Sequence, residues 1–96
     1  MTTYFVTRHA GAMEWAAEHG IAAVPVTHLD TAIIKTGDTV IGTLPVNLIA
    51  EINTKGARYF HLAMDVPEQH RGRNLTAGEM NAFGAVLEEY TAARAG

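Results

Sequence analysis

Residues 39–56 read TVIGTLPVNLIAEINTKG, and this stretch decides the fold. The apolar run Thr39–Gly42 contains β-branched side chains and predicts a short buried strand. Pro45 suits the first position of a helix, where its missing N–H is not needed, and that helix is expected to reach about Lys55. Because a second strand-like segment follows at 58–64, the sequence predicts two parallel strands joined by a crossover helix.

The segments before this unit have the same organisation. Residues 3–7 (TYFVT) predict a strand, and residues 12–19 predict a helix with apolar side chains at helical spacing. Residues 23–28 predict another strand, in which Pro25 indicates an edge or a bulge, since proline cannot donate to a neighbouring strand. A strand, a helix and a strand in succession again favour parallel pairing.

After the strand at 58–64 comes a polar loop, 65–74 (DVPEQHRGRN). Thr76 and Glu79 have the spacing of a capping box, in which each residue satisfies a backbone N–H of the other at the start of a helix. We expect one closing helix from this point. Its apolar stripe consists of Met80, Phe83, Leu87 and Tyr90.

The predicted order of elements is therefore strand, helix, strand, strand, helix, strand, helix. This alternation indicates an α/β domain whose helices cover both faces of a mostly parallel, four-stranded sheet. With right-handed crossovers, the arrangement is a minimal Rossmann-like three-layer sandwich. A chain of 96 residues has room for one hydrophobic core, so residues 1–96 are assigned to a single domain.

Composition narrows the classes of function. The chain has no cysteine, which excludes disulfides, thiolate metal sites and cysteine catalysis. Its net charge of −3 argues against binding to long nucleic acids, whose protein partners are usually basic. Neither a secretory signal nor an apolar run long enough to cross a bilayer is visible, so we expect a cytoplasmic protein without a membrane partner. Walker and GxGxxG motifs are absent, and we expect no cofactor and no metal.

The first candidate site follows the strand at 3–7, because ligands of open parallel sheets bind beyond the carboxyl ends of the strands. Thr7 offers a hydroxyl donor, and the planar guanidinium of Arg8 fits a phosphate. His9 could act as a general acid or base. Gly11, just before the helix, would let the backbone approach a ligand.

A second loop, Gly42-Thr43-Leu44, leads into the next helix and would offer backbone N–H groups and a hydroxyl in the same way. Arg71 and Arg73 flank a glycine in the loop at 65–74, which this topology places on the same rim. A local basic pocket on an acidic protein suits a small anionic ligand. The simpler interpretation is that the threonines cap helices and the arginines are solvated surface charges.

A different interpretation uses histidine and aspartate. His28 and Asp30 share one face if their segment is extended, and with His61 or Asp65 they could form a metal site. His61 lies in the middle of a predicted strand and is otherwise expected to be a hydrogen-bonded interior or interface residue.

Three segments together resemble a known protein family. They are residues 4–16 (YFVTRHAGAMEWA), 37–52 (GDTVIGTLPVNLIAEI) and 56–80 (GARYFHLAMDVPEQHRGRNLTAGEM), followed by LEEY at 87–90. In this order they resemble the small accessory proteins of type III CRISPR systems that carry the Csx prefix, a family related to the CARF sensor domain. The resemblance covers nearly the whole chain.

The resemblance implies a reduced, CARF-like domain that acts as a ring nuclease in antiviral defence. Such an enzyme binds cyclic oligoadenylate, here expected to be cyclic tetra-adenylate, and linearises it to switch off type III signalling. It implies a homodimer, and we expect metal-independent attack by a ribose 2′-OH that leaves a 2′,3′-cyclic phosphate. The family carries Ser-Arg-His where this chain has Thr7-Arg8-His9, so the hydroxyl is retained.

On this interpretation the candidate catalytic residues are Arg8 and His9. The candidate ligand-binding residues are Thr7, Gly11, Gly42, Thr43, Leu44, Arg71 and Arg73. Three alternatives stay open: a non-catalytic sensor or sponge for cyclic oligoadenylate, a metal-dependent phosphoesterase built on the histidine and aspartate residues above, and a protein-binding accessory without a small ligand.

Overall fold

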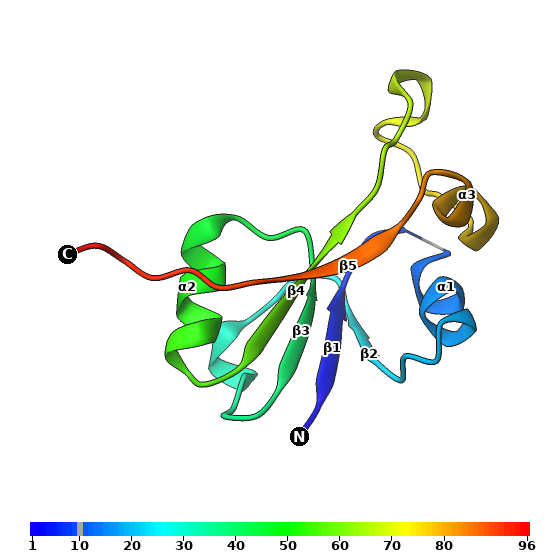
Figure 1. Ribbon diagram of the computed structural model, residues 1–96. Helices are drawn as coiled ribbons and strands as arrows, with labels where there is room; N and C mark the ends of the chain where they lie inside the picture. The colour runs from blue at the N-terminus through cyan, green and yellow to red at the C-terminus, as the bar shows by residue number, and fades with distance from the viewer. Residues whose placement is uncertain (10) are drawn as a thin grey trace.

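The computed structural model, which describes residues 1–9 and 11–96, contains a five-stranded sheet between two layers of helices (Figure 1). Helix α2 (Val46–Thr54) covers one face, and the short helices α1 (Ala12–Glu18) and α3 (Ala77–Ala82) cover the other. The strands are β1 (Thr3–Val6), β2 (Val24–Val26), β3 (Thr39–Gly42), β4 (Arg58–Ala63) and β5 (Val86–Tyr90), arranged in the order β2-β1-β3-β4-β5.

The parallel pairing predicted for the first four strands is confirmed. Strand β1 pairs in parallel with β2 and β3, and β3 pairs in parallel with β4. Strand β2 lies at one edge of the sheet, where the proline at position 25 is tolerated. The strands predicted at 3–7, 23–28 and 58–64 are shorter in the structure, because their last residues turn into the loops of the rim.

The prediction of one long closing helix is wrong beyond Ala82. The sheet has five strands, whereas four were predicted. Helix α3 ends at Ala82 because Gly84, two residues further on, has a φ of +73°, a conformation that favours glycine. The N–H groups of Gly84 and Ala85 bond to the carbonyls of Asn81 and Met80, which is the Schellman pattern of a helix end. The chain then continues as β5, antiparallel to β4, and the element order gains a final strand.

The two helix starts differ in how well the sequence predicted them. Pro45 is the N-cap of α2 and not its first residue, because its ψ of 156° is extended and the helix begins at Val46. The capping box of α3 is confirmed: the Glu79 backbone N–H donates to the Thr76 hydroxyl (3.1 Å), and the Thr76 N–H donates to the Glu79 carboxylate (3.0 Å).

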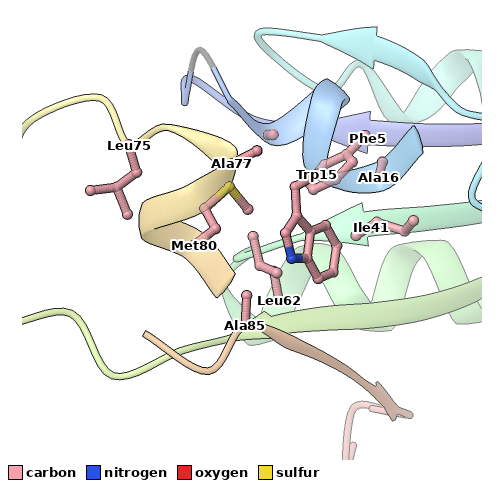
Figure 2. Packing of buried hydrophobic residues seen from close by; sticks show 10 residues of the cluster. Phe5, Trp15, Ala16, Ile41, Leu62, Leu75, Ala77, Met80 and Ala85 are labelled. Carbon is pink, nitrogen blue, oxygen red and sulfur yellow. The ribbon is translucent and has the colours of Figure 1, made fainter. Parts of the chain in front are cut away.

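Each face of the sheet has its own hydrophobic cluster. On the α1–α3 face, Trp15 and Met80 pack over Phe5, Ile41 and Leu62 of the sheet (Figure 2). On the α2 face the buried residues are Ile34, Val40, Ile49, Ile52, Ala57 and Tyr59. Fully burying one large apolar side chain is worth about 1.5–3 kcal/mol, so both helix layers are fixed firmly against the sheet. The loops between β1 and α1, β3 and α2, and β4 and α3 therefore each connect a strand to a helix that is packed against the sheet.

Candidate functional site: a basic cleft at the carboxyl edge of the sheet

A cleft of about 610 Å³ opens at the carboxyl edge of the parallel strands. It lies where the loops after β1, β2 and β3 meet the loop that follows β4. Of the candidate residues from the sequence, seven line it: Thr7, Arg8, His9, Gly42, Thr43, Leu44 and Arg73. The structure thus brings three separate loops together around one volume, as the parallel topology predicts.

The cleft is basic although the protein is acidic overall. The described residues that line it include two arginines, Arg8 and Arg73, two histidines, His9 and His28, and no carboxylate. Arg8 is exposed and makes no ion pair with any residue of the described ranges. The net charge of the whole chain is −3, whereas the described lining of the cleft carries arginines and no carboxylate. This charge distribution favours a small anion.

The loop after β1 is stabilised by its own first residue. The Thr7 backbone N–H donates to the carbonyl of Val26 on β2 (3.1 Å), and its hydroxyl oxygen accepts the backbone N–H of His9 (3.1 Å). The hydroxyl proton of Thr7 remains available to a ligand. The Nδ1 atom of His9 is buried and has no hydrogen-bond partner among the described residues.

Gly11 does not line the cleft, and its position explains why a glycine is present. A Cβ on this residue would lie 2.3 Å from the backbone nitrogen of Ala77 and 2.4 Å from the carbonyl carbon of Thr76. Its N–H donates to the carbonyl of Leu75 (2.9 Å). The close approach at Gly11 is therefore to the start of α3, outside the lining of the cleft.

A buried tyrosine on β4, Tyr59, holds the loop between β3 and α2 in place through hydrogen bonds. The Leu44 N–H donates to the Tyr59 hydroxyl oxygen (2.9 Å), and the hydroxyl donates to the Gly42 carbonyl (2.9 Å). Tyr59 is fully buried, and burial raises the pKa of its phenol while the Leu44 N–H lowers it by a smaller amount. The phenol therefore stays neutral at ordinary pH. Leu44 lines the cleft, and its backbone N–H already has the Tyr59 hydroxyl as a partner.

His61 completes this cluster. Its Nδ1 lies 2.7 Å from the Tyr59 hydroxyl oxygen. A carbonyl can only accept, so the single proton of the Tyr59 hydroxyl is donated to the Gly42 carbonyl. The contact between the Tyr59 oxygen and His61 is then a hydrogen bond only if His61 Nδ1 carries a proton and donates it. His61 is half-buried and its ring meets Tyr90 edge-on at 5.7 Å. His61 was predicted to be a hydrogen-bonded interior or interface residue; the hydrogen bond is present, and the side chain is half-buried.

The loop between β4 and α3 carries the two remaining arginines. Arg73 lines the cleft, and its guanidinium lies 3.2 Å from the Glu79 carboxylate, which also faces His70 Nε2 at 3.6 Å. The hydrogen bond from the Thr76 N–H is the main cause of the lowered pKa of Glu79, and the charges of Arg73 and His70 act in the same direction. Arg71 is exposed and lines a smaller, neighbouring cavity of about 310 Å³.

The histidine and aspartate residues of the metal interpretation are not brought together. Within residues 1–9 and 11–96, no group of three or more His, Cys, Asp or Glu side chains is placed to hold a metal ion. Asp30 accepts the N–H of Ala32 (2.9 Å) and caps the short 3₁₀ turn at Thr31–Ile33. His61 is bound to Tyr59, and His28 lines the cleft.

Sequence reasoning missed some residues of the cleft. Thr27 and His28 reach it from the loop after β2, and Asn74 from the loop before α3. The strand-end rule that selected the loops after β1 and β3 would also have selected Thr27 and His28 for an anion site. Tyr59 carried no such signal, since it lies near the start of β4 and not at the carboxyl end of a strand.

The fold and the cleft define a small α/β protein with a basic pocket at the carboxyl edge of a mostly parallel sheet. The chain belongs to the family described as "Putative CRISPR-associated protein (Cas_VVA1548)", whose model matches residues 4–93. No curated protein and no solved structure matches it. In the part of the chain that the structure describes, no helix has the length and apolar character needed to cross a membrane.

Proposed function

We propose that this CRISPR-associated protein is a ring nuclease that binds cyclic oligoadenylate, cyclic tetra-adenylate first of all, and opens it to end type III signalling. One observation carries the proposal: a cleft of about 610 Å³ whose described lining has two arginines, two histidines and no carboxylate. Membership of a CRISPR-associated family supports the biological setting. A cytoplasmic enzyme without cofactor or metal is part of the same proposal.

A cyclic oligoadenylate is a small polyanion, so it requires closely spaced phosphate sites and not a broad basic face. The Arg8 loop and the Thr43 loop lie on one rim, and each offers a hydroxyl next to a strand end. Two copies of the chain related by a two-fold axis would present every such group twice to a symmetric ring. We therefore include a homodimer in the proposal.

In the proposed reaction a ribose 2′-oxygen attacks the adjacent phosphorus and the P–O5′ bond breaks. The products are a 2′,3′-cyclic phosphate and a 5′-hydroxyl. One proton leaves the 2′-hydroxyl and one is gained by the 5′-oxygen; His9 Nε2 performs one of these transfers and solvent the other. No oxidant or metal is required. The main task of the protein is to hold the attacking oxygen, the phosphorus and the leaving oxygen in line.

Arg8 is assigned to the non-bridging phosphate oxygens, where charge grows in the transition state. Its guanidinium is suited to this because no described carboxylate neutralises it. Thr7 and Thr43 orient the phosphate through their hydroxyls, and Arg73 approaches from the loop above the ring. Tyr59 holds the Gly42–Leu44 loop in place from below.

The direct test is to incubate the purified protein with cyclic tetra-adenylate and cyclic hexa-adenylate, with EDTA or with Mg²⁺, and to identify products by liquid chromatography and mass spectrometry. We expect linear products ending in 2′,3′-cyclic phosphate, formed equally under both conditions. Cleavage only with Mg²⁺ would reject the metal-independent mechanism. Tight binding with the ring recovered intact would identify a sensor or sponge.

Two variants test the assignments. Arg8→Ala and His9→Ala, each shown to be folded, should both lose cleavage, while Arg94→Ala in the exposed C-terminal tail should not. Wild-type rates in both site variants would reject these roles.

A further inference from the structure

We infer that the smaller cavity beside the cleft is a nucleobase subsite, and this inference rests on the proposed function. The cavity has a volume of about 310 Å³ and lies under the loop between β4 and α3. Four residues line both it and the cleft: His9, Met64, Gly72 and Arg73. A ligand whose phosphate lies in the cleft therefore has a second compartment next to it.

The linings of the two compartments differ in chemistry. The cleft offers hydroxyls at Thr7 and Thr43 beside Arg8, which are donors for phosphate oxygens. The smaller cavity has apolar walls from Met64, Val66 and Leu75, and basic groups from His70, Arg71 and Arg73. Apolar walls together with arginine side chains match the flat face of a base, which is usually held by stacking on aromatic or arginine side chains.

One side of the smaller cavity is fixed. Leu75 is 1 % exposed and belongs to the core cluster shown in Figure 2. The ring of His70 meets the ring of Phe83 edge-on at 5.2 Å, and its Nε2 faces Glu79. These residues give a base a rigid wall, so little ordering is required there when a ligand binds.

The other side is adjustable. Arg71 is exposed, and the contact that holds it, from Nε to the Val66 carbonyl, is long at 3.4 Å. Its guanidinium can lie over a base without breaking an ion pair with any described residue. Arg73 differs, because its guanidinium is paired with Glu79. Arg71 is therefore the residue that we assign to stacking.

The size of the cavity limits the occupant. Small-molecule sites span about 300–1,000 Å³, and this cavity lies at the lower end of that range. A volume of this size suits a single base. In a cyclic oligoadenylate, the base beside the bound phosphate would enter it, and the subsite would distinguish a nucleotide from a bare phosphate ester.

The test compares AMP with ribose 5-phosphate by methyl and amide NMR of the wild-type protein. Val66 and Leu75 line only the smaller cavity, and Thr43 lines only the cleft, so each reports on one compartment. We expect ribose 5-phosphate to shift Thr43 alone, and AMP to shift all three. AMP that shifts Thr43 without Val66 and Leu75 would overturn the subsite and leave the proposed function standing. If AMP shifts the signals of Val66 and Leu75 but the protein cleaves no cyclic oligoadenylate, the subsite is supported and the proposed nuclease activity is rejected.

A variant provides the second measurement. Arg71→Ala should weaken AMP binding about ten-fold and leave ribose 5-phosphate binding unchanged, because base stacking is lost and the phosphate contacts are not. Arg94→Ala is the matched control and should change neither affinity. Equal weakening of both ligands by Arg71→Ala would show that Arg71 contacts phosphate, and would overturn the inference.

Discussion

The hydroxyl oxygen of Tyr59 lies 2.9 Å from the backbone nitrogen of Leu44. A side chain near the start of β4 thus reaches the loop that follows the neighbouring strand β3 and holds that loop in place. The same oxygen contacts the Gly42 carbonyl and His61, so three residues share one buried phenol as a hydrogen-bond partner.

Tyr59→Phe should keep the packing of the ring and remove these hydrogen bonds. The Leu44 N–H and the Gly42 carbonyl would then lose a buried partner, which costs about 1–3 kcal/mol of unfolding free energy. Urea unfolding measures this loss, and a titration with cyclic tetra-adenylate should show weaker binding. Tyr4→Phe is the control, since the Tyr4 hydroxyl has no hydrogen-bond partner among the described residues; a loss equal in both variants would contradict the assignment.

Gly11→Ala should destabilise the protein, because the new methyl group would meet the backbone of Thr76 and Ala77 at 2.3–2.4 Å. Overpacking of this kind costs about 1–3 kcal/mol, and backbone atoms have little room to yield. Gly78→Ala is the matched control in α3, where the nearest atom to a Cβ is 3.9 Å away. It should stabilise the protein by up to about 1 kcal/mol through helix propensity. Thermal unfolding of both variants should therefore show shifts of opposite sign.

Asp38 should make stability depend on acid pH. Its carboxylate is buried and accepts the backbone N–H groups of Thr2 and Lys35 (2.9 Å each), and these bonds, Thr2 first, lower its pKa below the usual 3.8. A lowered pKa in the folded state gives stability that is present above 3.8 and is lost as pH falls through the lower, folded-state value.

Asp38→Asn should lower stability at pH 7 and flatten the fall in acid, because an amide can accept at one position only. Chemical unfolding from pH 7 to pH 2 measures both effects. Asp65→Asn is the control, since its exposed carboxylate accepts no hydrogen bond from the described residues. An unchanged acid slope in Asp38→Asn would contradict the prediction.

Arg8→Lys should reduce ring cleavage about 100-fold while the charge is kept, because a lysine cannot reproduce the two parallel hydrogen bonds of a guanidinium. Steady-state kinetics with cyclic tetra-adenylate would show the loss in kcat more than in KM. Arg94→Lys should behave as wild type. If Arg8→Lys retains full activity, the arginine supplies only a diffuse positive field.

The frame of the fold and the place of the site could be predicted from the sequence because both follow from local patterns. Thr39–Gly42, the proline after it and the segment at 58–64 define a parallel unit, and the chirality of crossovers fixes where its loops emerge. The cleft lies at that edge. Seven candidate residues line it for this reason.

The helical spacing of the apolar residues continues past Gly84, although this glycine stops the helix. The predicted closing helix is therefore too long. Met80, Phe83, Leu87 and Tyr90 have helical spacing, yet Gly84 interrupts them with a left-handed turn. Met80 alone of the four is fully buried, and Tyr90 is 48 % exposed. A glycine followed by Val86-Leu87 was a readable sign of a helix end and a new strand.

Other features could not be predicted from a single sequence. The bond between Tyr59 and Leu44 depends on the register of β3 and β4, and the contact of Gly11 with Ala77 depends on how α1 meets α3. Both are decided by tertiary packing, and neither residue pair has a spacing that marks it.

The reversal of β5 has a practical consequence for handling this protein. Because β5 runs against the other strands, Tyr90 pairs with Tyr59 near the start of β4, far from the rim, and β1 begins at that same end of the sheet. The tail then passes α2, where the Ala92 N–H donates to the Asn53 side chain (2.8 Å). Figure 1 shows the N-terminus beside the start of β1 and the C-terminus beyond α2, both away from the carboxyl ends of the parallel strands. A biosensor surface or a fluorescent fusion joined at either end would leave the basic rim facing the solution.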